Sequence, residues 1–199
     1  MTAQPKPAYS VEAYLEIERA GPHKHEYYRG EIFALAGSSE AHNLILANIL
    51  TALNVQLRKR PCRVYPSDMR LKIPQTGLYT YPDISVVCGT PQFDDSRRDT
   101  LLNPVMIIEI LSPSTERYDR GKKFQNYRTV ATLQEYVLVS QDDYHIEHYT
   151  KQNDEDWLLR SFDGINATLQ LKAIDCTLSL ENVYDKVDIA TPGDDFPTT

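Results

Sequence analysis

The chain has 199 residues, of which 41% are hydrophobic and 25% charged, the usual composition of a globular domain. With 21 basic and 28 acidic residues its formal charge is −7, and a chain of this length buries enough surface for one core, so we expect one domain. No segment approaches the ~20 apolar residues that span a bilayer and the N-terminus lacks the apolar run of a signal peptide, so we expect a cytoplasmic protein without membrane contact.

The first third of the sequence predicts a helix, a hairpin and a second, longer helix. Ser10 is suited to cap a helix over residues 11–18. Two short apolar runs over residues 25–37 are divided by Arg29-Gly30 and predict a β-hairpin. Apolar residues at helical spacing predict a long helix over residues 41–60, which ends before Pro61.

The remainder predicts several strands and one further helix. The apolar run over 104–111 is typical of a strand buried on both faces. The other expected elements are strands over 63–73, 81–89 and 135–141, a helix over 121–130, a hairpin over 144–162 and short strands after it. This order predicts a mixed α/β (α+β) domain with a central mixed β-sheet flanked by helices.

Charge and cysteine placement add two expectations. Residues 1–139 hold 17 Lys+Arg and 15 Asp+Glu, whereas residues 140–199 hold 4 and 13. We expect residues 1–9 and the acidic tail 186–199 to be flexible around one domain over 10–185. The three cysteines are isolated, without a CxxC pair, which argues against a disulfide framework or a cysteine-built zinc site.

Two carboxylates stand inside segments that should be core. Asp83 follows Pro82 at the start of a predicted strand, and every neighbour of Glu109 is apolar. A buried lone carboxylate costs several kcal/mol unless it is paired or coordinated. On adjacent strands the two acids would form a hard-oxygen site of the type that Mg²⁺ prefers, with the Ile110 backbone carbonyl as a third ligand. The alternative is a structural pairing of Glu109 with Arg or Lys.

The predicted helix after this strand offers the positive group. Asp119, Lys123 and Tyr127 recur at i, i+4 and i+8 and lie on one stripe. Lys123 lies at the border of the buried side, whereas Lys122 is nearly opposite, so Lys123 is the better candidate to reach a site. The alternative is a simple ion pair between Lys123 and Asp119.

These residues resemble a known family. Pro82-Asp83 followed by Glu109 in an apolar strand is similar to the PD-(D/E)XK nuclease superfamily. More closely, the segments YPDISVVCG, IIEILSPSTERYDRGKKFQNYR and EYVLVS resemble the Uma-two family of predicted restriction endonucleases. The resemblance extends upstream to EYYRGEIFALAG and SSEAHNLI and covers about residues 10 to 185. It implies a restriction-endonuclease-like core.

The resemblance also implies roles for single residues. Asp83 and Glu109 match the two acidic ligands of Mg²⁺ or Mn²⁺. The superfamily's lysine two residues after the second acid is Leu111 here, and Lys123 of the following helix would replace it by orienting the attacking water. Glu31 matches a further acidic position that would join the metal site. Polar positions shared with the family, without an assigned role, are Glu26 and His42.

The function implied by the resemblance is metal-dependent hydrolysis of phosphodiester bonds in DNA, by a homodimer whose two sites reach both strands. Two alternatives stay open. One is a catalytically silent nuclease-like domain that binds DNA or a protein partner, and the other is a metal-dependent hydrolase with a different substrate.

Overall fold

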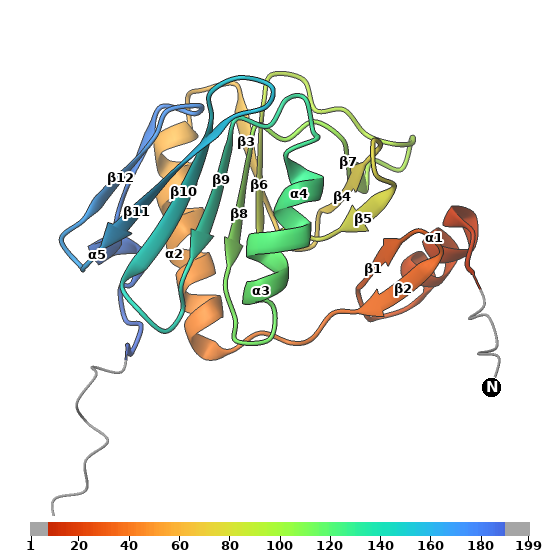
Figure 1. Ribbon diagram of the computed structural model, residues 1–199, viewed down its shortest axis with the longest axis horizontal. Coiled ribbons are helices and arrows are strands. Elements are labelled where there is room, and N and C mark those ends of the chain that lie inside the picture. The colour runs from red at the N-terminus through yellow and green to blue at the C-terminus, as the bar shows by residue number, and fades with distance from the viewer. Residues whose placement is uncertain (1–7, 190–199) are drawn as a thin grey trace, which may run out of the picture.

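The structure is a computed structural model that describes residues 8–189 (Figure 1). Its strands form a six-stranded sheet in the order β11-β10-β9-β8-β6-β3, a five-stranded sheet in the order β2-β1-β5-β4-β7, and the pair β12-β13. The elements are α1 (Val11–Ala20), β1 (His25–Tyr28), β2 (Glu31–Ala34), α2 (Glu40–Leu57), β3 (Cys62–Pro66), β4 (Arg70–Ile73), β5 (Leu78–Thr80), β6 (Ile84–Cys88), β7 (Thr100–Leu101), β8 (Met106–Ile110), α3 (Glu116–Tyr118), the π-helical turn η1 (Asp119–Lys123), α4 (Phe124–Tyr127), β9 (Glu135–Val139), β10 (His145–Lys151), β11 (Trp157–Asp163), β12 (Thr168–Leu171), β13 (Cys176–Ser179) and α5 (Leu180–Val183). The predicted mixed α/β fold is confirmed.

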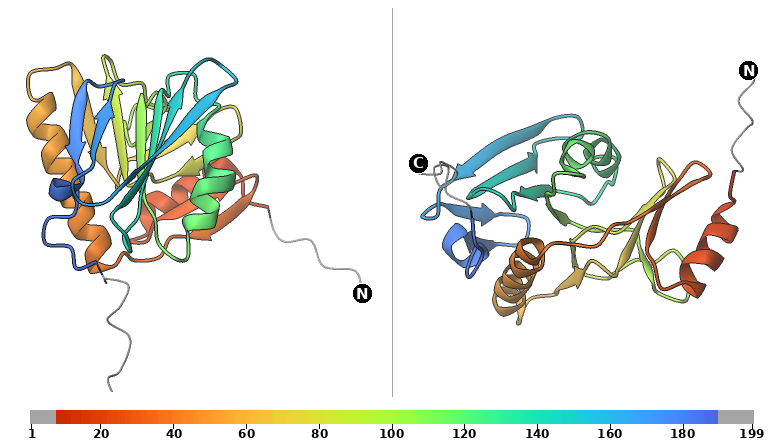
Figure 2. Two further views of the ribbon diagram at one scale, coloured as in Figure 1. Left: turned by 60° about the vertical axis from the view of Figure 1, so that its left-hand side comes forward. Right: turned by 90° about the horizontal axis from the view of Figure 1, so that it is seen from below.

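The six-stranded sheet is the centre of the molecule. β8 and β9 are parallel and the other pairs are antiparallel. Helix α2 begins at the N-cap Ser39 and buries Ile45, Ile49 and Leu53, four residues apart, against one face of this sheet. The C-terminal pair β12-β13 and α5 join α2 on that face (Figure 2).

The opposite face of the six-stranded sheet carries the second core cluster. It is covered by the α3–η1–α4 segment and by strands β4, β5 and β7 of the five-stranded sheet. Tyr127 and Tyr136 are fully buried there, with ring centroids 5.4 Å apart. Side chains of β8 therefore meet α2 on one face of the sheet and the α3–η1–α4 segment on the other.

The N-terminal hairpin extends the five-stranded sheet. Arg29 and Gly30 both have positive φ, 49° and 89°, which suits a tight two-residue hairpin turn. Helix α1, capped by the Ser10 side chain, packs Tyr14 onto Tyr27 and Tyr79 in a small aromatic core. An extended segment then runs from the hairpin beneath α3 to α2 (Figure 1).

Three predicted elements differ from the structure. The predicted strand 63–73 is wrong as a single strand, because a turn in which the Met69 amide donates to the Pro66 carbonyl divides it into β3 and β4, which belong to different sheets. The protein thus has two large sheets. The helical segment after β8 covers 116–127 where residues 121–130 were predicted, and α2 ends at Leu57.

The cysteines also differ from expectation. Cys62 and Cys88 occupy partner positions on the antiparallel strands β3 and β6 and form a disulfide. Their separation by 26 residues gives no sequence signal, because only the register of the two strands brings them together. Cys176 is a buried free thiol.

The described part of the chain is packed slightly beyond the predicted limits of 10 and 185. The Tyr9 amide donates to the Gly30 carbonyl at 2.9 Å, and Val187 is buried against the α2 side of the core. The rest of the predicted flexible ends, residues 1–7 and 190–199, lies outside the described residues. Within the described residues, no helix is long and apolar enough to cross a membrane.

Candidate functional site

The register of β6 and β8 places the two predicted acids opposite each other. Ile84 pairs with Ile108 in this antiparallel pair, so the residue before Ile84 faces the residue after Ile108. Side chains alternate along a strand. Since Ile108 and Ile110 pack against α2, Glu109 projects from the opposite face, toward α3–η1–α4. Asp83 lies opposite Glu109 in this register, so its side chain projects from the same face of the sheet.

Backbone amides hold the two carboxylates in place. The Ile110 amide donates to Asp83 Oδ2 at 2.8 Å, and the Asp83 amide donates to Glu109 Oε2 at 3.3 Å. Asp83 Oδ1 accepts no hydrogen bond from residues 8–189. Each acid therefore keeps an oxygen that is weakly engaged or free of hydrogen bonds within this part of the chain. The Ile110 carbonyl as a ligand stays a prediction.

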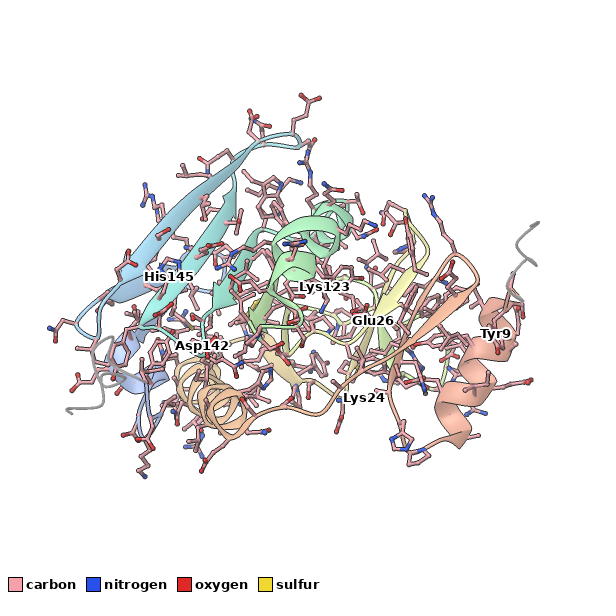
Figure 3. The ribbon with its side chains drawn as sticks, turned by 60° about the horizontal axis from the view of Figure 1, so that its bottom comes forward. Tyr9, Lys24, Glu26, Lys123, Asp142 and His145 are labelled. Carbon is pink, nitrogen blue, oxygen red and sulfur yellow. A yellow bond between two sulfur atoms is a disulfide. The ribbon has the colours of Figure 1, made fainter. Side chains whose placement is uncertain are left out.

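Lys123 reaches this pair from the π-helical turn η1. Its Nζ lies 3.0 Å from Glu109 Oε1, 3.2 Å from Asp119 Oδ1 and 3.6 Å from Glu26 Oε1. The residue is 7% exposed, and Lys122 beside it is exposed, as the helical spacing predicted. Figure 3 shows Lys123 close to Glu26, between the helical segment and the hairpin. Single π-turns of this kind are frequent at functional sites.

Burial and crowding of charges shift the pKa values of this cluster. Burial raises the pKa of Glu109 to about 8, and the carboxylates of Asp119 and Asp83 add to the increase while Lys123 opposes it. Burial likewise raises the pKa of Asp119. Burial alone would lower the pKa of Lys123, but Glu109, Asp119 and Glu26 outweigh it and hold that pKa well above its usual value. Lys123 is thus a permanent cation.

Four polar residues without an assigned role are brought into the cluster. His42 of α2 places Nε2 3.2 Å from Asp83 Oδ2, which the Nε2–H tautomer can bond. Tyr127 donates to Glu109 Oε1 at 2.6 Å. Glu26 accepts from Tyr118 at 3.0 Å and from Thr80. Asp119, the fourth, forms an ion pair with Lys123. The i, i+4 spacing of these two residues in the sequence predicted that they lie on one side of the helix. Glu26 and His42 are remote in sequence, and only the family resemblance pointed to them.

Glu31 differs from its prediction. It is the first residue of β2, its side chain is exposed, and it lies outside the lining of the cavity that Asp83 and Glu109 share. The hairpin acid that reaches Lys123 is Glu26, on the neighbouring strand β1. Two acids five residues apart on one hairpin look alike in sequence, and the pairing of β1 with β5 decides which one is near the site.

The acids open into a cavity of about 290 Å³. Polar side chains from several separated segments line it, among them Lys24, Ser39, His42, Ser112, Ser114, Thr115, Asp119, Lys123 and Gln141. Asp83 has a side-chain exposure of 16%, whereas Glu109 is nearly enclosed. A ligand entering this cavity would meet Asp83 first and Glu109 and Lys123 behind it.

The donor set fits a divalent cation with oxygen ligands. Asp83 Oδ1 and Glu109 Oε2 are the oxygens left available, and Mg²⁺ is commonly held by one or two carboxylates together with waters and substrate phosphates. Among residues 8–189, no group of three or more His, Cys, Asp or Glu side chains is arranged to hold a metal. A pair of acids of this kind suits an ion whose coordination waters and the substrate complete.

Known proteins resemble this chain over most of its length. Residues 11–181 match the Uma2 family, described as "Putative restriction endonuclease". Two uncharacterized proteins of Synechocystis sp. are 39% identical over 157 residues (79% of this chain, 89% of the relative) and 37% identical over 180 residues (90% and 93%). A crystal structure from Anabaena variabilis, described as "a putative nuclease belonging to DUF820", matches with a TM-score of 0.72 at 20% identity, over 88% of this chain and 97% of that chain. At this identity the likeness shows a shared fold.

Proposed function

The chain belongs to the Uma2 family of restriction-endonuclease-like proteins, and from this premise we propose that it is a metal-dependent endonuclease that hydrolyses phosphodiester bonds in DNA. The observation that carries the proposal is the pair of carboxylates set opposite each other on β6 and β8, with the Lys123 ammonium 3.0 Å from Glu109. This combination of two acids and one cation at a cavity suits the binding and hydrolysis of a phosphate group.

Mg²⁺ or Mn²⁺ would be held by Asp83 and Glu109, with the Ile110 carbonyl as a further ligand. Such an ion polarises a phosphate oxygen and lowers the pKa of a bound water when it is present. His42 and the Ile110 amide both bind Asp83 Oδ2. They would leave Asp83 Oδ1 directed to the cavity, so their role is to orient this acid.

Lys123 would position the attacking water and stabilise charge on the phosphate. Its ammonium has three N–H groups and forms ion pairs with Glu109, Asp119 and Glu26, of which the one with Glu26 is the longest at 3.6 Å. An N–H that now faces Glu26 would turn to a water or to a phosphate oxygen. Because its pKa is raised, Lys123 stays protonated, and it would act as a donor and a charge, with the proton of the water passing to solvent or phosphate.

A cleavage assay tests the proposal. The purified protein would be incubated with single-stranded, duplex and branched DNA in Mg²⁺ or Mn²⁺, beside Asp83→Asn and Glu109→Gln. We expect cleavage by the wild type that both variants and a chelator abolish. Cleavage that persists in both variants would overturn the assignment of the site. A folded wild type that binds DNA and cuts none of it would favour the catalytically silent domain. Hydrolysis of phosphodiesters other than nucleic acids alone would favour a metal-dependent hydrolase with a different substrate.

We further propose that two copies associate, the state that the family resemblance implies. Light scattering on the purified protein tests this. A mass of 22.8 kDa, that of one chain, at all concentrations would contradict it.

A further inference from the structure

A second cavity adjoins the acidic one and has a different lining. It has a volume of about 880 Å³ and lies between the β1–β2 hairpin and the α3–η1–α4 segment. Four residues line both cavities: Leu35, Ser114, Thr115 and Lys123. The two cavities are therefore adjacent and share part of their walls, and together they are called the groove below, with Asp83 and Glu109 at one end.

Aromatic and apolar surface dominates the hairpin side of this groove. Tyr28 and Phe33 line it, and Phe33 is 46% exposed. Tyr118 faces them from α3. A large aromatic side chain exposed to this degree in a groove offers a flat surface on which a planar ligand can stack.

Basic side chains stand on both sides of the same groove. Arg29 of the hairpin turn lies over the Tyr28 ring at 5.0 Å, and Lys122 comes from η1 on the opposite side. Within residues 8–189 neither Arg29 nor Lys122 forms an ion pair. Both cations are therefore available to an anionic ligand, in a groove whose other end is built for a phosphate.

Burial of the site favours a flexible ligand over a rigid one. Glu109 is 3% exposed and Lys123 is 7% exposed, so the reacting phosphate must enter the cavity to meet them. In an intact duplex the bases are stacked and paired and cannot face Phe33. An unpaired strand is flexible, and stacking of its bases on aromatic side chains combined with backbone contacts to basic residues is the usual mode of single-strand binding.

We propose that this groove binds an unpaired stretch of a DNA strand beside the phosphate that is cut, with a base on Phe33 and Tyr28 and a backbone phosphate between Arg29 and Lys122. This rests on the proposed nuclease function and specifies its substrate class: single strands, or duplexes with a loop, flap or bulge.

Fluorescence anisotropy in the absence of divalent metal tests the proposal. The probes are a short labelled single strand and the duplex of the same sequence. We expect the single strand to bind the full-length protein at least about tenfold more tightly than the duplex. Phe33→Ala should weaken that binding about tenfold, because one stacked base contributes ~1–3 kcal/mol. Lys122→Gln should weaken it and lower the salt dependence by ~0.7 in the log–log slope.

Two matched controls accompany these variants. Leu159→Ala removes a side chain with the same 46% exposure on β11, and Lys59→Gln removes an exposed lysine beyond α2. Neither should change the affinity. Equal or tighter binding of the duplex, or an unchanged affinity in Phe33→Ala, would overturn the proposal.

The two proposals fail in different ways. Suppose the protein binds single strands, Phe33→Ala weakens that binding, and no DNA is cleaved in Mg²⁺ or Mn²⁺. The proposal of a single-strand groove would then stand, and the proposed nuclease function would be wrong. Metal-dependent cleavage with no preference for unpaired DNA and no effect of Phe33→Ala would keep the nuclease and reject the groove.

Discussion

Glu109 and Glu135 are two buried glutamates on the parallel neighbours β8 and β9, and their surroundings differ. Both are almost inaccessible, with exposures of 3% and 1%. Glu135 Oε1 accepts the Lys172 amide at 2.8 Å and the Ala173 amide at 3.3 Å. Glu109 Oε1 instead binds two side chains, those of Tyr127 and Lys123, at the wall of a cavity.

The difference separates a structural carboxylate from one suited to chemistry. Two backbone amides fix Glu135 Oε1 and tie β9 to the segment after β12, whereas Glu109 accepts a single backbone amide, at 3.3 Å, on its other oxygen. Glu109 instead stands at the wall of a cavity, where a cation or a phosphate could meet it. Burial of an acid within an apolar strand therefore does not by itself indicate a functional site. The partners of the acid do: backbone amides indicate a structural role, and side chains at a cavity wall indicate a functional one.

The largest effect is expected from the acids of the site. Asp83→Asn and Glu109→Gln should each lower metal-dependent cleavage on the order of 10³-fold, the usual loss when one charge-stabilising group is removed. Glu135→Gln should leave cleavage per folded molecule unchanged. Cleavage rates with each protein normalised for its folded fraction measure this. If Glu135→Gln lost as much cleavage activity as Glu109→Gln, the distinction between a structural and a functional glutamate would be wrong.

Lys123→Met is expected to have the next largest effect. It removes the cation that neutralises Glu109, Asp119 and Glu26 while all three stay buried, so the free energy of unfolding should fall by about 3 kcal/mol. Urea unfolding in the absence of metal measures it. Mg²⁺ or Mn²⁺ should restore more stability to this variant than to the wild type, and an equal gain in both would contradict the account.

Glu135→Ala should be destabilising through a different route. It removes the acceptor of two partly buried backbone amides, those of Lys172 and Ala173, at a cost of about 2 kcal/mol. Divalent metal should restore none of this loss, which urea unfolding with and without Mn²⁺ would show. Stabilisation of Glu135→Ala by metal beyond that of the wild type would mean that the second glutamate also takes part in the cation site.

The smallest effect, taken per pH unit, is a pH dependence of stability that is specific to Glu109. Burial raises its pKa from 4.5 to about 8, so across this range the folded protein holds a proton that the unfolded chain has released. The free energy of unfolding of the metal-free protein should therefore fall as the pH rises from 4.5 to about 8, by at most ~1.4 kcal/mol per pH unit.

Glu109→Gln isolates this contribution. The variant should lack the decrease and become more stable than the wild type at the upper end of the range, as the difference between the two unfolding curves at each pH would show. A wild type and variant with parallel pH profiles would show that Glu109 titrates normally.

The sequence predicted the parts of this site that depend on local periodicity. Asp83 and Glu109 were predicted because each is a carboxylate in an otherwise apolar strand segment. Asp119 and Lys123 were predicted because they recur at helical spacing. Both signals are local properties of the sequence. Glu26 lies 97 positions from Lys123 along the chain, and its contact depends on how β1 joins the second sheet. Long-range pairing of that kind leaves no pattern in a single sequence.

The same reason explains what the sequence misjudged. The division of residues 63–73 between two sheets and the disulfide between Cys62 and Cys88 both depend on which strands become neighbours. Periodicity shows which face of a strand is apolar but not which partner covers it. Family resemblance pointed to both Glu31 and Glu26 and gave a role to Glu31 alone, and the hairpin places Glu26 beside Lys123.

The most direct test of the account is a calorimetric titration with Mn²⁺ of the wild type, Asp83→Asn, Glu109→Gln and Glu135→Gln, in the presence of inorganic phosphate as a stand-in for the substrate. The account predicts binding by the wild type and by Glu135→Gln, and its loss in both Asp83→Asn and Glu109→Gln. Binding that survives in both site variants, or none by the folded wild type, would contradict the claim that these two carboxylates form a cation site.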